Sequence, residues 1–117
     1  MEIQLPEIID RITILILKIE RSDNFAFVEE LNEYNMALTE YEDKGVNIKQ
    51  EWFDRLFDIN SYMWDLFSQI SYLKKRSNLK EIGTIYIELL KSNKIRIAQK
   101  NKIVDQTGVG FKDIKIN

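Results

Sequence analysis

The 117-residue sequence contains no cysteine and no histidine. Without cysteine the chain forms no disulfide and offers neither a thiolate nucleophile nor a thiolate metal ligand. Without histidine it has no imidazole for acid–base catalysis and lacks a side chain that commonly binds zinc. Any enzyme chemistry would have to use carboxylates, lysine, tyrosine or a hard cation such as Mg²⁺.

Neither sign of charge dominates, and no long apolar run is present. Seventeen Lys and Arg residues against nineteen Asp and Glu residues give a formal charge of -2. Because a dedicated DNA or RNA binder normally has a clear basic excess, nucleic acid is not an expected partner. The apolar run 8–19 is interrupted by Asp10, Arg11 and Lys18, so it is too short and too charged for a membrane span or a secretion signal. We expect a cytoplasmic protein without a cofactor.

Apolar residues recur at helical spacing along most of the chain, which predicts an all-α protein. Short connections between the helices favour an antiparallel bundle that forms one domain over residues 1–117. The tail 111–117 alternates apolar and polar residues, and we expect it to be extended, as a short strand or an arm laid on the bundle. The four helices are expected at about residues 7–21, 25–43, 47–76 and 78–105.

Polar residues and glycine mark the expected helix ends. Asn47 with Gln50, and Asn78 with Glu81, have the spacing of capping pairs, in which the asparagine side chain binds a free backbone N–H. Gly45 follows the second predicted helix, where a left-handed residue commonly ends a helix.

The first predicted helix is more apolar than one bundle face requires. Ile14 and Leu17 fall on the side opposite its main apolar face, and Phe53, Phe57 and Trp64 flank the main stripe of the third helix. A few exposed aliphatic residues are common on any surface. A second contact surface for a twin subunit explains the pattern more fully, so we expect a homo-oligomer.

The last predicted helix carries three polar residues in its apolar stripe. On a helical wheel centred on Ile82, Asn93 and Lys100 fall in the middle of the stripe, and Arg96 falls at its edge. A charge that faces a core is costly unless it is paired and hydrogen-bonded. These side chains therefore require acceptors, either within the fold or in a ligand.

Two interpretations of this trio remain open. In the first, Asp10, Glu20 or Asp65 neutralises the two cations in an internal network, or Lys100 extends outward to solvent. In the second, Arg96 and Lys100 bind an anion, because guanidinium and ammonium groups both recognise phosphate and carboxylate.

The second interpretation predicts further members of an anion site. Lys18 and Arg11 of the first helix can add positive charge, and Asn93 supplies an amide that both donates and accepts. Trp64, like Tyr62 or Tyr86, can provide a flat wall for a base.

Two carboxylate pairs suggest a third possibility. Glu30 with Glu33, and Glu51 with Asp54, superficially resemble the pattern of all-helical nucleoside triphosphate pyrophosphohydrolases, which bind Mg²⁺ between helices. If the second and third helices are antiparallel, however, the two pairs lie several turns apart.

Several segments together resemble an uncharacterised family of small helical proteins of bacteria and phages, some encoded near glycosyltransferase genes. The similarity covers most of the chain and rests on residues 7–20 (EIIDRITILILKIE), the Trp64-Asp65-Leu66 segment, Asn93-x-x-Arg96-x-x-x-Lys100, and Lys112-Asp113-Ile114-Lys115. The resemblance implies a shared polar site without a known activity. Its members here are Asp10, Lys18, Trp64, Asp65, Asn93, Arg96, Lys100 and Lys115.

The third helix departs from the family pattern, because Phe67, Gln69 and Ser71 stand where acidic residues and an arginine are usual. This loss favours a binding pocket over an acidic catalytic site. Our leading hypothesis is a non-enzymatic protein that binds a small anionic ligand, most plausibly a nucleotide or nucleotide-derived signal. In a phage, it would sequester a host immune signalling nucleotide. The alternatives are a protein-interaction or inhibitor module and the Mg²⁺-dependent pyrophosphohydrolase.

Overall fold

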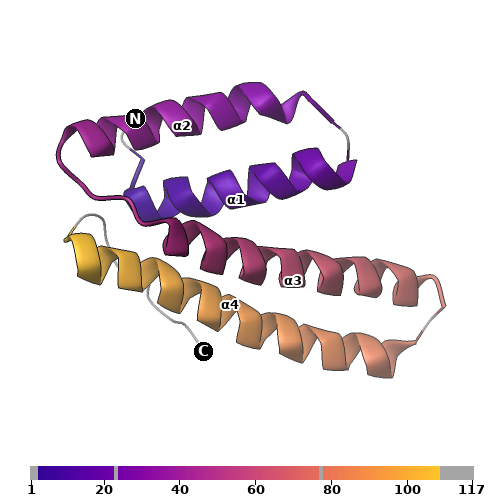
Figure 1. Cartoon of the computed structure of the whole chain (residues 1–117). Helices are drawn as coiled ribbons and strands as arrows, with labels where there is room; N and C mark the ends of the chain where they lie inside the picture. Colours follow the sequence, from indigo (N-terminus) through magenta and orange to yellow (C-terminus); the bar gives the residue numbers. More distant parts are fainter. Residues whose placement is uncertain (1–2, 23, 77, 109–117) are drawn as a thin grey trace.

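The computed structural model describes residues 3–22, 24–76 and 78–108, and these ranges contain four α-helices and no strand (Figure 1). The predicted all-α class is confirmed, whereas the predicted extended tail lies outside the described residues. None of the helices in these ranges is long and apolar enough to cross a membrane. The helices are α1 (Leu5–Ser22), α2 (Phe27–Asp43), α3 (Gln50–Lys74) and α4 (Leu79–Thr107).

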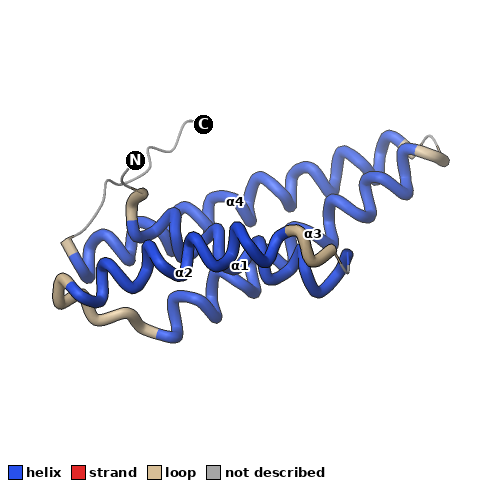
Figure 2. Tube along the Cα trace, turned by 90° about the horizontal axis from the view of Figure 1, so that it is seen from above, coloured by secondary structure: helices blue, strands red, loops and turns tan. Residues whose placement is uncertain are grey.

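The helices form two antiparallel hairpins, α1 with α2 and α3 with α4 (Figure 1). The backbone of α1 lies close to those of α3 and α4, whereas the backbone of α2 lies close to that of α1 alone, with no Cα atom within 8 Å of a Cα atom of α3 or α4. Seen from above, the α1–α2 pair lies across the α3–α4 pair at an angle, and the far end of α3–α4 projects beyond it (Figure 2).

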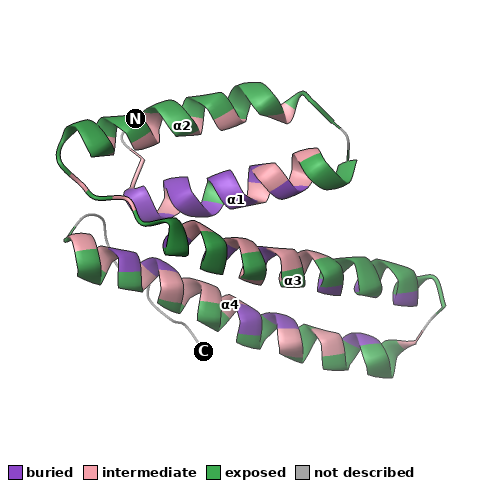
Figure 3. Ribbon diagram, viewed as in Figure 1, coloured by how far each residue is buried: buried purple, intermediate pink, exposed green. Residues whose placement is uncertain are grey.

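α1 is the central helix, which explains its unusually apolar sequence. Ile8, Ile9, Ile12 and Leu15 are buried, and so is Leu17, for which the wheel had predicted an outward position. Ile14 is half-buried. The prediction that Leu17 belongs to an exposed contact surface is therefore wrong, because α2 covers one side of α1 while α3 and α4 cover the other (Figure 3).

Ten of the fourteen buried apolar residues in the described ranges form two clusters of five. The first joins α1, α3 and α4 through Leu5, Ile9, Leu56 and Ile103, with Trp52 donating its indole N–H to Gln106 Oε1 at 2.8 Å. The second lies in the projecting part of the α3–α4 hairpin. It contains Leu66, Ile70, Leu73, Ile82 and Leu89.

α2 is the least buried helix. None of its residues is buried, and the apolar seam at its helical spacing of three and four lies only half-buried against the rest of the molecule. The seam consists of Phe27, Leu31, Tyr34, Leu38 and Tyr41. α2 is therefore held by one neighbouring helix, and its outer face is open (Figure 3).

Two of the predicted helix ends are confirmed and one is wrong. Asn78 Oδ1 accepts the N–H of Glu81 at 3.3 Å, and Gly45 has a φ of 93° in the left-handed region. Asn47 does not cap α3, because the helix begins at Gln50 and the residue before it, Lys49, has an extended backbone. The side chain of Ile48 packs against the first apolar cluster, which favours this extended approach.

Candidate functional site

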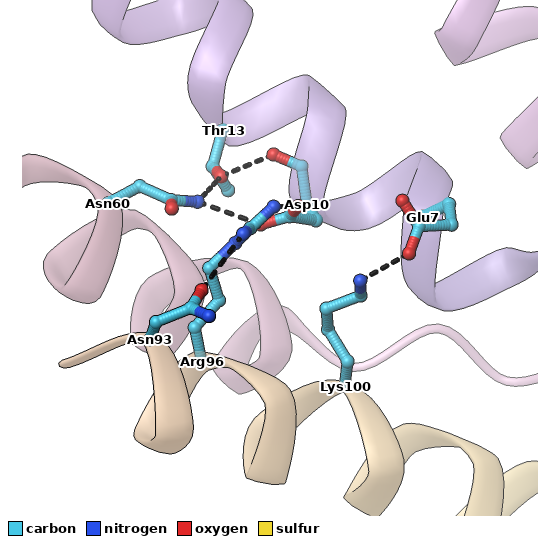
Figure 4. A network of polar contacts seen from close by, with 7 residues as sticks. All are labelled: Glu7, Asp10, Thr13, Asn60, Asn93, Arg96 and Lys100. Atoms are coloured by element: carbon cyan, nitrogen blue, oxygen red, sulfur yellow. Dashed lines mark hydrogen bonds and ion pairs between the residues drawn. The ribbon is translucent and has the colours of Figure 1, made fainter. Parts of the chain in front are cut away.

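Asp10 is fully buried on α1, and its carboxylate binds the Arg96 side chain of α4 (Figure 4). Arg96 Nε donates to Asp10 Oδ1 at 3.0 Å, and Arg96 Nη2 donates to Asp10 Oδ2. Two parallel N–H···O bonds between a guanidinium and a carboxylate form the strongest ion-pair geometry available to these groups. The positive charge of Arg96 is thus compensated from within the fold.

Three uncharged side chains complete the hydrogen bonding around this pair (Figure 4). Asn60 Nδ2, on α3, lies 2.9 Å from both Asp10 Oδ1 and Thr13 Oγ1. The Thr13 hydroxyl donates to the Asp10 carbonyl oxygen at 2.7 Å, and Arg96 Nη1 donates to Asn93 Oδ1 at 3.3 Å. The network therefore links α1, α3 and α4, and Asn60 and Thr13 are members that the sequence analysis missed.

Lys100 lies about one turn beyond Arg96 and forms an ion pair with Glu7 (Figure 4). Its side chain is only 9% exposed, so the ammonium needs this carboxylate. The internal network predicted for the trio is thus present with Asp10 as the partner of Arg96. The partner of Lys100, however, is Glu7 and neither Glu20 nor Asp65. Glu7 lies about one turn from Asp10 on α1, and Lys100 lies about one turn from Arg96 on α4, so the second ion pair forms next to the first.

Asp65 belongs to a different, exposed group of contacts. Its carboxylate lies 2.6 Å from Arg21 Nη1, and Arg21 Nη2 donates to the Ser61 hydroxyl at 2.7 Å. The same guanidinium lies 5.7 Å from the centroid of the Trp64 ring. The predicted placement of Asp65 beside Arg96 and Lys100 is therefore wrong, because Asp65 points to the C-terminal turn of α1.

Lys18, Trp64 and Arg96 line a common cavity of about 250 Å³ next to the network. Its other walls are mainly apolar, and the Lys18 ammonium also lies 5.1 Å from the centroid of the Phe27 ring. Arg11 is exposed and does not line this cavity. The remaining lining residues are Ile14, Leu17, Asn60, Met63 and Phe67.

The two carboxylate pairs considered for Mg²⁺ lie on helices that do not contact each other. Glu30 and Glu33 are on α2, whereas Glu51 and Asp54 are on α3. In the part of the chain that the structure describes, no group of three or more carboxylates is placed to hold a metal ion. Glu51 instead lies 3.7 Å from the Arg55 guanidinium, and Asp54 accepts a hydrogen bond from Gln50 at 3.1 Å.

A cleft of about 440 Å³ lies between α2 and α3, with α1 as its floor. Ile16 forms the apolar part of the floor, Leu38 lines the α2 wall, and Phe53 and Phe57 line the α3 wall. All four side chains are half-buried. The two phenylalanines were predicted from the sequence to belong to a contact surface, whereas Leu38 was not.

The edges of this cleft are acidic. Asp54 lines the α3 wall, and Asp58 is exposed one turn further along the same helix. α2 contains six Asp or Glu residues and no Lys or Arg, although Glu33 and Glu40 line a different pocket beside Ile3. Apolar walls with acidic edges favour a ligand that combines an apolar surface with positive charge.

No family model, curated protein or solved structure matches this chain. The family resemblance therefore stays a prediction from the sequence. Of the residues it implies, Asp10, Asn93 and Arg96 meet in one network, while Lys115 lies outside the described ranges.

Proposed function

We propose that this protein is a non-enzymatic interaction module that binds a basic amphipathic helix in the cleft between α2 and α3. The observation that carries the proposal is the arrangement of α2 and α3, which both flank α1 while their backbones stay more than 8 Å apart between Cα atoms. An amphipathic helix placed in such a cleft would contact helices on three sides, as in other helix-in-groove interactions.

The lining of the cleft supports this ligand class. Phe53 and Phe57 are one turn apart on α3 and face Leu38 across the α1 floor. Aromatic side chains at the centre of an interface commonly supply much of the binding energy. Asp54 lies beside these apolar contacts and Asp58 is one turn further along α3, where both attract lysine and arginine and disfavour acidic helices.

The polar trio of α4 gives less support to the small-anion hypothesis. Arg96 and Lys100 are both engaged by carboxylates of α1, so an anion would have to displace Asp10 or Glu7. Displacing Asp10 would leave a fully buried carboxylate without its cation, which is costly.

A fluorescently labelled synthetic helix tests the proposal. The probe has about 18 residues, leucines on one face and lysines on the other, and its matched control has glutamates in place of the lysines. In fluorescence anisotropy titrations, the lysine helix should bind the wild-type chain and the glutamate helix should not. Phe57→Ser should weaken binding about tenfold or more, since the loss of a central aromatic contact costs about 1.4 kcal/mol or more.

Phe67→Ser is the matched control, because Phe67 is an exposed aromatic residue on the same helix but outside the cleft. Its affinity for the lysine helix should stay within about twofold of the wild-type value. Equal losses in the two variants, or equal binding of the lysine and glutamate helices, would show that the cleft is not the binding site.

A second candidate, the binding of a small anion, has one observation in its favour. Lys18, Trp64 and Arg96 share the cavity beside the network, so a ring could stack on the indole while Lys18 meets an anionic group. Isothermal calorimetry against a panel of nucleotides, with Lys18→Ala as the variant and Lys44→Ala as the control, tests this function. The function would be ruled out if no nucleotide of the panel binds, or if Lys18→Ala leaves the binding unchanged.

A further inference from the structure

We infer that the helix bound by the cleft is α4 of a second copy of this chain, so that the protein assembles head to tail. This inference rests on the proposed function and adds the identity of the partner. Its basis is the outer face of α4, which has the charge and the exposed apolar side chains that the cleft requires.

The outer face of α4 is both apolar and basic. Ile87 and Leu90 are 56% and 66% exposed, and Lys91, Lys94 and Lys102 are exposed on the same side of the helix. Exposed aliphatic side chains that adjoin one another, unlike single exposed ones, are a feature of interaction surfaces. Over its whole length α4 contains six Lys or Arg residues against three Asp or Glu residues.

The charges of α2 and α4 are complementary, although the net charge of the chain is small. α2 has six acidic residues and no basic one, whereas α4 has a basic excess. Within one molecule the two helices do not contact each other. A second copy that inserts its α4 into the cleft brings these basic residues to Asp54 and next to the acidic helix α2, which favours both the affinity and the orientation of the complex.

The positions of the two surfaces determine the kind of assembly. No residue of α4 lines the cleft, and the outer face of α4 points away from α1 and α3. In Figure 1, α2 and α4 form opposite outer layers of the molecule. A copy that inserts its α4 into a neighbour therefore keeps its own cleft open, and such a heterologous contact forms either a ring or an open filament.

Two variants, each with one damaged surface, test this assembly by sedimentation velocity over a series of concentrations. Phe57→Ser damages the cleft, and the double variant Ile87→Ser/Lys94→Glu damages the outer face of α4. The wild-type chain should form species larger than a dimer that dissociate as salt is raised, whereas each variant alone should be monomeric. An equimolar mixture of the two variants should form a heterodimer and nothing larger, because it contains one intact cleft and one intact α4 face.

Two control variants test whether any loss of assembly is specific to the two surfaces. Phe67→Ser and Lys75→Glu alter exposed residues outside both surfaces and should assemble like the wild-type chain. Circular dichroism verifies the helix content of each variant, and Lys94→Glu alone provides a milder change that should shift assembly to higher concentration. A wild-type chain that is monomeric at all concentrations, or a mixture that stays monomeric, overturns the inference.

Binding of the synthetic lysine helix distinguishes a wrong self-assembly inference from a wrong proposed function. If the lysine helix binds the cleft and the chain stays monomeric, the cleft binds a helix from another protein and the self-assembly inference is wrong. If neither the lysine helix nor a second copy binds, both proposals are wrong. A closed dimer that both single-surface variants weaken equally, and that their mixture does not restore, also contradicts head-to-tail assembly.

Discussion

Replacing Arg96 with methionine should destabilise the fold strongly, because it leaves the Asp10 carboxylate buried with its charge uncompensated. Asp10 is fully buried, and without Arg96 it keeps a hydrogen bond from Asn60 but no cation. Removing one partner of a buried ion pair typically costs about 3–5 kcal/mol. Because the Arg96 side chain is 25% exposed, we expect the lower end of that range, about 3 kcal/mol.

The reverse change, Asp10→Asn, should cost less. It leaves the charge on Arg96, which solvent reaches, and the asparagine keeps an oxygen that can accept from the guanidinium. We expect a loss of about 1–2 kcal/mol. Arg96→Met should thus lose more stability than Asp10→Asn, because Asp10 is less exposed to solvent than Arg96.

Urea denaturation followed by circular dichroism measures both free energies of unfolding, and thermal melts should show Arg96→Met lower by roughly 10–15 °C. Arg55→Met is the control, because Arg55 forms an exposed pair with Glu51 at 3.7 Å and should contribute less than about 0.5 kcal/mol. A loss of stability in Arg96→Met no larger than in Arg55→Met, or a larger loss in Asp10→Asn than in Arg96→Met, would contradict this prediction.

Three further predictions concern the core, a helix end and a titrating tyrosine. Leu56→Ala removes a fully buried side chain from the first cluster and should cost about 2–5 kcal/mol in urea denaturation. Asn78→Ala removes the cap of α4 and should cost about 1 kcal/mol in the same assay. The pKa of Tyr62 is raised above its usual 10.0 by desolvation and then by the Glu88 carboxylate, to which the phenol donates at 3.3 Å. The raised pKa means that its contribution to stability is complete below pH 10 and is lost above it, and Tyr62→Phe should remove one phenolate signal from the near-ultraviolet titration.

The features that depend on local sequence were predictable. Apolar spacing located four helices, and Asn78 and Gly45 marked two of their ends. The wheel also predicted that Lys100 points inward while Arg96 lies at the rim, in agreement with their exposures of 9% and 25%. These features depend on the geometry of one helix, for which the period of 3.6 residues is sufficient.

The features that depend on how helices are placed against one another were not predictable. A helical wheel shows which side of a helix is apolar but not which neighbouring helix covers that side. Leu17 was therefore predicted to face outward, although α1 has neighbours on more than one side. The pairing of Lys100 with Glu7 depends on the register between α1 and α4, which no local pattern specifies. The same holds for the cleft, because the separation of α2 from α3 is a property of the tertiary arrangement alone.

The polar network has a further consequence for the uniqueness of the native state. The buried side of α1 consists mainly of leucine and isoleucine, which can replace one another in a core, so apolar packing alone selects its register against α3 and α4 only weakly. Only one setting brings the Asp10 carboxylate to Arg96 and Asn60 together. Loss of these contacts should therefore leave α1 helical but able to occupy several registers, broadening its NMR resonances before the molecule unfolds.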